Sequence, residues 1–99
     1  MLWSHHRAIE AGINDAVFVD IVRRLDDAVA EIDGTGFSHT PLVDLSTVGS
    51  AIGHTGRIVG KDETGNVSGT HKARHLFALA LHLEVDNTPT DTPLVIASC

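Results

Sequence analysis

The feature that most constrains the fold is the segment 61–85, where a polar, glycine-containing turn runs directly into a long apolar helix. Residues 65–70 hold two glycines together with three hydroxyl or amide side chains, a composition typical of a turn. The helix expected over 71–85 is apolar almost all round, and a helix of this kind is buried rather than surface-lying. The sequence therefore predicts an internal helix with this turn at its N-terminus.

The first turn of that helix carries cationic and imidazole side chains at His71, Lys72, Arg74 and His75. Cations there oppose the positive end of the helix dipole, at a cost of a few tenths to about 1 kcal/mol each when exposed. A sequence selected for stability alone would place Asp or Glu at these positions. Electropositive side chains beside a helix N-terminus are instead typical of a site for an anion or an electrophilic cofactor. We therefore expect the functional site at this turn.

Residues 66–74 read Asn-Val-Ser-Gly-Thr-His-Lys-Ala-Arg, which resembles the lysine motif of fold-type II pyridoxal-phosphate enzymes. This family includes the tryptophan synthase β-subunit, threonine synthase, cysteine synthase and the serine/threonine dehydratases. Its motif usually reads Asn-Pro-Thr-Gly-Ser-x-Lys-x-Arg, so Val67 here replaces the proline, and one hydroxyl residue replaces another at two positions. The segments 40–42 (Thr-Pro-Leu), 61–63 (Lys-Asp-Glu) and 94–99 also match family segments in the right order. The resemblance covers about residues 37 to 99.

The resemblance implies a partial tryptophan synthase β-like α/β fold and a pyridoxal 5′-phosphate cofactor. Lys72 would carry that cofactor as a Schiff base and, once released from it by transaldimination with the substrate, would act as the general base at the substrate α-carbon. The implied cofactor-binding residues are Asn66, Ser68, Gly69, Thr70, His71 and Lys72. The implied reaction is a β- or γ-elimination or replacement on a small amino acid, catalysed by a homo-oligomeric parent enzyme. The amino acid and the reaction subtype are not specified by these motifs.

Each of these residues also has a simpler interpretation. A lysine in the first turn of an exposed helix is usually only solvated, whereas Lys72 precedes an apolar helix within a matching motif. Ser68, Gly69 and Thr70 are suited to a turn and helix cap with or without a cofactor, and Asn66 can simply shape the turn. The residues 61 and 63 are more typical of a solvated strand end than of an active site. The sequence alone does not decide between these structural interpretations and a functional role.

Two further hypotheses concern metal binding and thiol chemistry. His71 and His75 lie one helical turn apart, a spacing that suits zinc. His82 lies too far along the same face to join one ion, on the order of 10 Å from His75. Cys99 has no oriented histidine and acid partner in the sequence, so we interpret it as a buried or terminal thiol.

The composition excludes several classes of protein. The net charge of −6, with only seven Lys and Arg residues, argues against nucleic-acid binding. No apolar run approaches the roughly 18 to 20 residues that a membrane span needs, and the N-terminus lacks the apolar region of a signal peptide. A single cysteine cannot form an internal disulfide, which favours a reducing compartment, and we expect the cytoplasm.

The remaining elements follow from periodicity. An amphipathic helix is expected over 15–33, capped by Asn14 or Asp15 and ended by Gly34 and Gly36. Residues 1–13 are ambiguous, with a short helical turn around 7–11. Residues 37–45 are expected to be extended, 49–56 to be a loop, 57–62 a strand, 87–93 a loop and 94–98 a second strand, parallel to the first. We thus predict an N-terminal helical segment (1–36) and a partial cofactor-binding domain (37–99) built on one βαβ unit.

Two parallel strands and one apolar helix leave strand edges unpaired and the helix uncovered. From this, and from the end of the chain just after the second strand, we expect an N-terminal fragment that binds pyridoxal phosphate weakly or not at all on its own. The rival hypothesis is a non-catalytic fragment or interaction module without a cofactor. A small metal-binding module built on His71 and His75 is the third.

Overall fold

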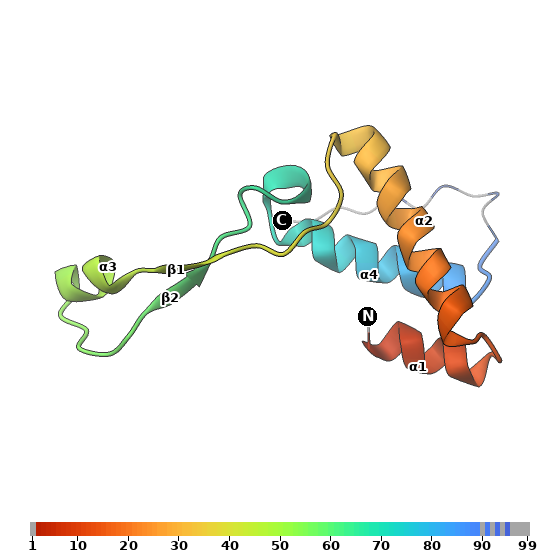
Figure 1. Cartoon of the computed structure of the whole chain (residues 1–99), viewed down its shortest axis with the longest axis horizontal. Coiled ribbons are helices and arrows are strands. Elements are labelled where there is room, and N and C mark those ends of the chain that lie inside the picture. The colour runs from red at the N-terminus through yellow and green to blue at the C-terminus, as the bar shows by residue number, and fades with distance from the viewer. Residues whose placement is uncertain (1, 90, 92, 94, 96–99) are drawn as a thin grey trace.

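The computed structural model describes residues 2–89, 91, 93 and 95 of the chain (Figure 1). Within these residues the protein is a mixed α/β chain with four α-helices, one short 3-10 helix and a two-stranded antiparallel sheet. The elements in chain order are α1 (Leu2–Glu10), α2 (Asp15–Asp33), β1 (Leu42–Asp44), α3 (Ser46–Ala51), β2 (Val59–Lys61), η1 (Val67–Gly69) and α4 (Lys72–Val85).

The helix expected over 15–33 is confirmed as α2, and its two ends form for the predicted reasons. At the start, the side chain of Asn14 accepts a hydrogen bond from the backbone N–H of Val17 at 3.0 Å. At the end, Gly34 takes a left-handed conformation with φ 85° and its N–H donates to the carbonyl of Ala30. Both caps satisfy backbone groups that a helix terminus leaves without an intrahelical partner.

The hydrophobic core is small and lies where α1, α2 and α4 meet (Figure 1). Its buried members are Ala8 from α1, Phe18 from α2, and Leu81 and Val85 from α4. Partly buried side chains pack around them, namely Ile13, Ile21, Val22 and Leu25. The core therefore joins the N-terminal helices to the helix that follows the turn, and the domain boundary at residue 36 stays a prediction.

The helix expected over 71–85 is confirmed as α4, and the prediction that it is buried holds for only part of its surface. Leu81 is fully buried, whereas Leu76 and Leu79 each keep 37% of their surface exposed. The reason is that the neighbours of α4 cover only one of its faces: α1 and α2 pack on Leu81 and Val85, and Phe37 contacts Phe77, one turn before Leu81 on that face, with ring centroids 4.8 Å apart. An apolar composition alone does not decide which faces of a helix find neighbours.

The expected strand at 57–62 forms as β2, and it pairs with β1 in antiparallel register, with Val43 opposite Gly60. The βαβ unit required a parallel partner at 94–98, a segment that falls outside the described residues except for Val95, which is in no strand. The parallel pairing therefore stays a prediction, while the only sheet within the described residues is antiparallel.

The expected loop at 49–56 is partly wrong, because residues 46–51 form α3. The side chain of Asp44 accepts a hydrogen bond from the backbone N–H of Ser46 at 2.7 Å, which favours the start of a helix at this point. Gly49 is buried, and a Cβ atom there would lie 3.1 Å from the side chain of Ile58. This glycine therefore permits close packing inside a helix and does not mark a loop.

Residues 42–61 form an arm that extends away from the three packed helices, with α3 at its outer end (Figure 1). The radius of gyration is 17.4 Å, compared with about 13 Å for a compact chain of about 100 residues. The arm exposes apolar side chains, with Leu42 at 69% and Ile52 at 72% of their surface.

As to membrane insertion, none of the described helices has the length and apolar character to cross a bilayer.

The position of Leu81 in the core leads to a prediction about stability. Leu81→Ala should lower the free energy of unfolding by about 2–5 kcal/mol, because it removes a fully buried side chain and leaves a cavity. The matched control is Leu79→Ala, which removes the same atoms from the same helix at a half-exposed position and should cost clearly less. Urea denaturation followed by circular dichroism measures both, and equal losses would contradict the assignment of the core.

Candidate functional site

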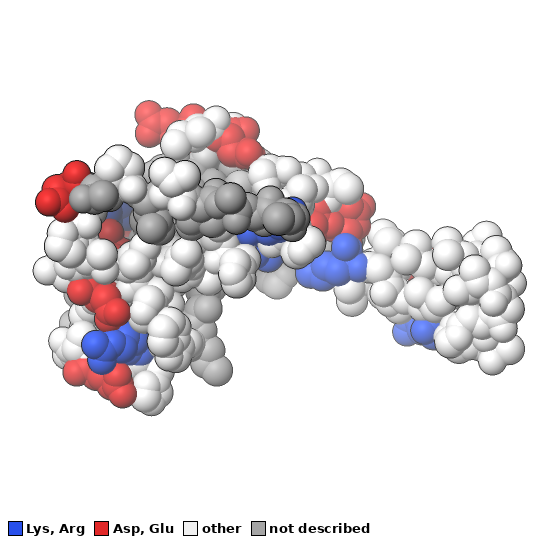
Figure 2. All heavy atoms as spheres, turned by 180° about the vertical axis from the view of Figure 1, so that it is seen from behind, with Lys and Arg blue, Asp and Glu red and all other residues white. Residues whose placement is uncertain are grey.

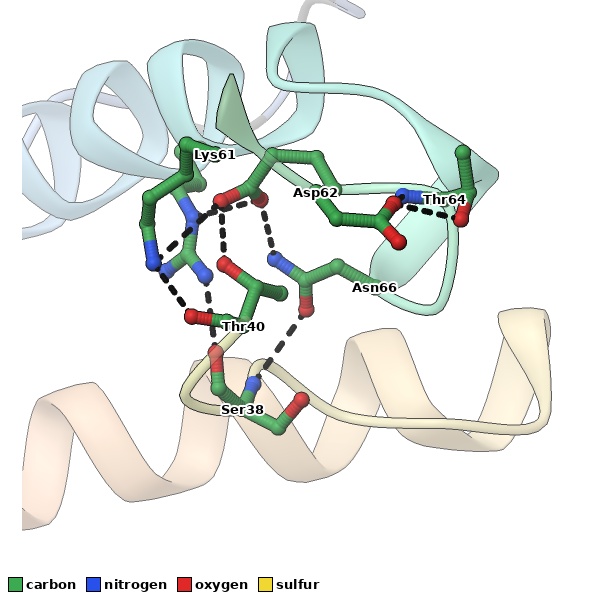
Figure 3. A network of polar contacts seen from close by, with 8 residues as sticks. Ser38, Thr40, Lys61, Asp62, Thr64 and Asn66 are labelled. Carbon is green, nitrogen blue, oxygen red and sulfur yellow. Dashed lines mark hydrogen bonds and ion pairs between the residues drawn. The ribbon is translucent and has the colours of Figure 1, made fainter. Parts of the chain in front are cut away.

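A largely buried carboxylate organises the region around the predicted turn (Figure 3). Glu63 follows β2, and its side chain keeps only 11% of its surface exposed. Its carboxylate accepts hydrogen bonds from the hydroxyl of Thr40, from Nδ2 of Asn66 at 2.8 Å and from Nε of Arg74 at 2.9 Å. These donors, with Thr40 first, lower the pKa of Glu63 from 4.5 to about 2. The interpretation of residue 63 as a solvated strand end is therefore wrong.

The hydrogen-bond network extends from Glu63 to the segment that precedes β1 (Figure 3). Asn66 accepts a hydrogen bond from the backbone N–H of Ser38 at 3.2 Å, and Arg74 donates to the carbonyl of Ser38 at 2.7 Å. Lys61 donates to the carbonyl of Thr40 at 2.7 Å, and its Nζ lies 3.9 Å from the Glu63 carboxylate. The network thus ties together three segments: residues 38–40, the end of β2 with the turn, and the first turn of α4.

A cavity of about 470 Å³ opens beside this network. Its lining residues are Phe37, Ser38, His39, Lys61 and Arg74. The guanidinium carbon of Arg74 lies 5.7 Å from the centre of the Phe37 ring, a cation–π geometry that holds the arginine over the aromatic face. Two cations and one aromatic wall, with Glu63 as their nearby counter-charge, make this cavity suitable for a small anion or a planar polar group.

The turn at 66–70 contains two consecutive residues in the left-handed region. Ser68 has φ 56° and Gly69 has φ 63°, so the strain falls on the serine, at about 1 kcal/mol or more. The serine is held there because its backbone N–H donates to the carboxylate of Asp33 at 3.0 Å. Its hydroxyl lies 3.3 Å from that of Thr70. Strained residues that the surrounding structure holds in place are found most often at functional sites.

The structure places the six predicted site residues in three different settings. Asn66 is buried, and its side chain belongs to the Glu63 network, which agrees with a role in shaping the turn. Ser68, Gly69, Thr70 and His71 are exposed along the turn that leads into α4. Lys72 opens α4 and is half-buried, and no hydrogen bond or ion pair joins its side chain to another residue in the described part of the chain.

The two lysines of the chain therefore differ in their surroundings. The ammonium group of Lys61 is held by a carbonyl and faces a carboxylate, whereas Lys72 lies outside that network. The first turn of α4 contains no acidic residue. The third cation of this region, Arg74, points back to Glu63 and Ser38. This leaves Lys72 as the amine that is not committed to a structural contact among the described residues.

The sequence did not reveal the Glu63 network. Its partners lie 23 residues before Glu63 at Thr40 and 11 residues after it at Arg74, separations that follow no helical or strand period. The only local signal is the spacing of three between Glu63 and Asn66.

For the metal hypothesis, the described residues contain no group of three or more side chains that could hold an ion, so His71 and His75 find no third ligand among them.

Comparisons with known protein families, with curated proteins and with solved structures find no match for this chain. The resemblance of residues 66–74 to the lysine motif stays a prediction, and so do the cofactor and the reaction that it implies. A function is therefore inferred from the residues of this chain and from their geometry.

The lowered pKa of Glu63 predicts a defined dependence of stability on pH. The ionised carboxylate stabilises the folded state, so its contribution is fully present above pH 4.5 and is lost as the pH falls toward about 2. Glu63→Gln removes the charge and keeps the shape of the side chain. Asp44 and Asp62 also have lowered pKa values, through hydrogen bonds from Ser46 and Thr64, but both remain in the variant.

The measurement is urea denaturation of the wild type and of Glu63→Gln at neutral pH and at several values across this window. The wild type should be the more stable protein at neutral pH, and its advantage should shrink as the pH falls below 4.5. An advantage of the same size at every pH would show that the ionised carboxylate does not stabilise the fold.

Proposed function

We propose that this chain belongs to a pyridoxal-phosphate-dependent lyase or synthase in which Lys72 is the amine that binds the cofactor covalently. The observation that carries the proposal is the contrast between the two lysines: Lys61 is bound by Thr40 and Glu63, while Lys72 follows a strained turn and lies outside that network. An amine that forms a covalent bond must be available as a nucleophile, and a hydrogen-bonded ammonium facing a carboxylate is not.

The residues of the turn fit a cofactor that is anionic and electrophilic. Residues 64–72 contain no carboxylate, and the hydroxyls of Ser68 and Thr70 lie side by side, 3.3 Å apart, just before α4. Hydroxyls and backbone N–H groups beside a helix N-terminus are ordinary ligands of a phosphate or a phenolate oxygen. Lys72 would hold the cofactor covalently and residues 68–71 would contact it. Asn66 would keep the turn in place through its hydrogen bonds with Glu63 and Ser38. A direct contact between Asn66 and the cofactor is implied only by the resemblance of residues 66–74 to the lysine motif.

The chemistry then divides between cofactor and protein. Pyridoxal phosphate, when bound, stabilises the electron pair that is released when a proton leaves the α-carbon of an amino acid. The chain supplies the amine of Lys72, which would remove that proton as a general base once the amino group of the substrate has displaced it from the cofactor. The Glu63 network holds the turn and the first residues of α4 in one arrangement, so the amine stays positioned. The substrate class that follows is a small amino acid that undergoes β- or γ-elimination or replacement.

The test is chemical labelling of the protein expressed from its complete reading frame with pyridoxal phosphate. Borohydride reduction followed by peptide mapping should find the pyridoxyl label on Lys72 and not on Lys61. Lys72→Ala should abolish both the label and the turnover of amino acids. Lys72→Arg should do the same, because a guanidinium stays protonated and is not a nucleophile.

The matched control is Lys61→Arg, which keeps a cation opposite Glu63 and should keep the label on Lys72. A label on Lys61, or a Lys72→Ala protein with near-normal turnover, would overturn the proposal.

A second candidate is a non-catalytic interaction module without a cofactor. The observation that favours it is the exposure of apolar side chains on the arm, where Leu42 and Ile52 keep 69% and 72% of their surface and Val48 keeps 53%. The labelling experiment separates the two functions, since a module of this kind would take up no stoichiometric label on either lysine.

A further inference from the structure

A second cavity, of about 640 Å³, lies at the outer end of the arm, away from the Glu63 network. The side chains that line it and carry a hydrogen-bond donor are Ser46, Ser50, His54, Thr55 and Arg57. Two glycines, Gly53 and Gly56, complete its wall. Its volume falls within the range of small-molecule pockets, which is roughly 300–1,000 Å³.

The fold of the arm explains how these residues come together. Ser46 and Ser50 are four residues apart on α3 and therefore share one face of that helix. The chain then reverses at Gly53, which has φ 73°, and the backbone N–H of His54 donates to the carbonyl of Gly49 at 2.9 Å. This reversal brings residues 54–57 back across the same face of α3.

The imidazole of His54 lies directly against Gly56. A Cβ atom at residue 56 would come within 2.6 Å of Nε2 of His54, closer than such atoms approach in folded proteins. A side chain at residue 56 would therefore displace the imidazole. The glycine is needed for the present shape of the cavity wall, and it offers a way to move His54 without replacing it.

The charges around the cavity favour an anion. No carboxylate lines it, and Arg57 forms no hydrogen bond or ion pair with another of the described residues. Between residues 42 and 60 the only acidic or basic side chains of the Asp, Glu, Lys and Arg types are Asp44 and Arg57. Figure 2 shows the arm as a largely uncharged surface with a basic spot. The one acid of the arm, Asp44, accepts hydrogen bonds from the backbone N–H and the hydroxyl of Ser46, so this hydroxyl is already used.

We propose that the cavity at the end of the arm binds a small oxyanion, a phosphate or carboxylate group, with the guanidinium of Arg57 as its main ligand. An arginine fork matches the two oxygens of such a group and gives charge-assisted hydrogen bonds that are stronger than neutral ones. His54 and the hydroxyls of Ser50 and Thr55 supply further donors around the same space. This site is independent of Lys72 and of the proposed cofactor.

The test is a titration of the 99-residue chain with inorganic phosphate, followed by two-dimensional ¹⁵N NMR. We expect saturable shifts of the backbone signals of Gly53, Gly56 and Arg57, with signals of α2 and α4 unchanged. Arg57→Gln should weaken binding by about tenfold or more, because it removes the charged ligand. Gly56→Ala should also weaken it, by displacing the imidazole of His54.

The matched control is Arg23→Gln, an exposed arginine of α2 that lies outside the arm and should leave the titration unchanged. A parallel titration with succinate separates the two sources of the oxyanion: saturation by phosphate alone assigns a phosphate group, and saturation by both assigns a general oxyanion site. Shifts that do not saturate with either probe, or that are equally large in Arg57→Gln, would overturn the proposal. Unchanged signals of β1 and β2 in each variant show that the arm keeps its fold.

Discussion

The ionised carboxylate of Glu63 holds three segments together: residues 38–40, the end of β2 with the turn, and the first turn of α4. It accepts hydrogen bonds from Thr40 before β1, from Asn66 in the turn and from Arg74 in α4. A largely buried charge is stable only when it is paired and hydrogen-bonded, and the loss of the carboxylate would leave buried donors unpaired. The same contacts that keep Glu63 ionised therefore fix the turn against the sheet and the start of α4.

The elements that the sequence predicts well are those with strong local signals. Helix α2 has an apolar stripe of helical period, an asparagine cap and a terminal glycine, and its observed bounds agree with the prediction. The short helix α3 was missed because glycine is usually a sign of a loop, whereas Gly49 is there to pack against Ile58. The apolar composition of α4 predicts burial but not the exposed face with Leu76 and Leu79, because burial depends on which other helices cover it.

In the candidate site, too, the sequence predicts local features but not the contacts that depend on the tertiary fold. The motif at 66–74 located the turn and the start of α4, which are local features. It did not show that Asn66 is buried in a network with Glu63, because the partners Thr40 and Arg74 are brought together only by the tertiary fold. This network makes the surroundings of Lys61 differ from those of Lys72, and the proposed function depends on that difference. It holds Lys61 and Arg74 in structural contacts and leaves Lys72 outside them.

The most direct test of this contrast is the reactivity of the two lysines, which are the only ones in the chain. Competitive acetylation at neutral pH, with the sites read separately by mass spectrometry, compares their nucleophilicity within one molecule. If the Glu63 network holds Lys61 and spares Lys72, Lys72 should react faster in the wild type, and Glu63→Gln should raise the rate at Lys61 more than the rate at Lys72. A wild-type protein in which Lys61 reacts as fast as Lys72 or faster, with no change in Glu63→Gln, would contradict this account.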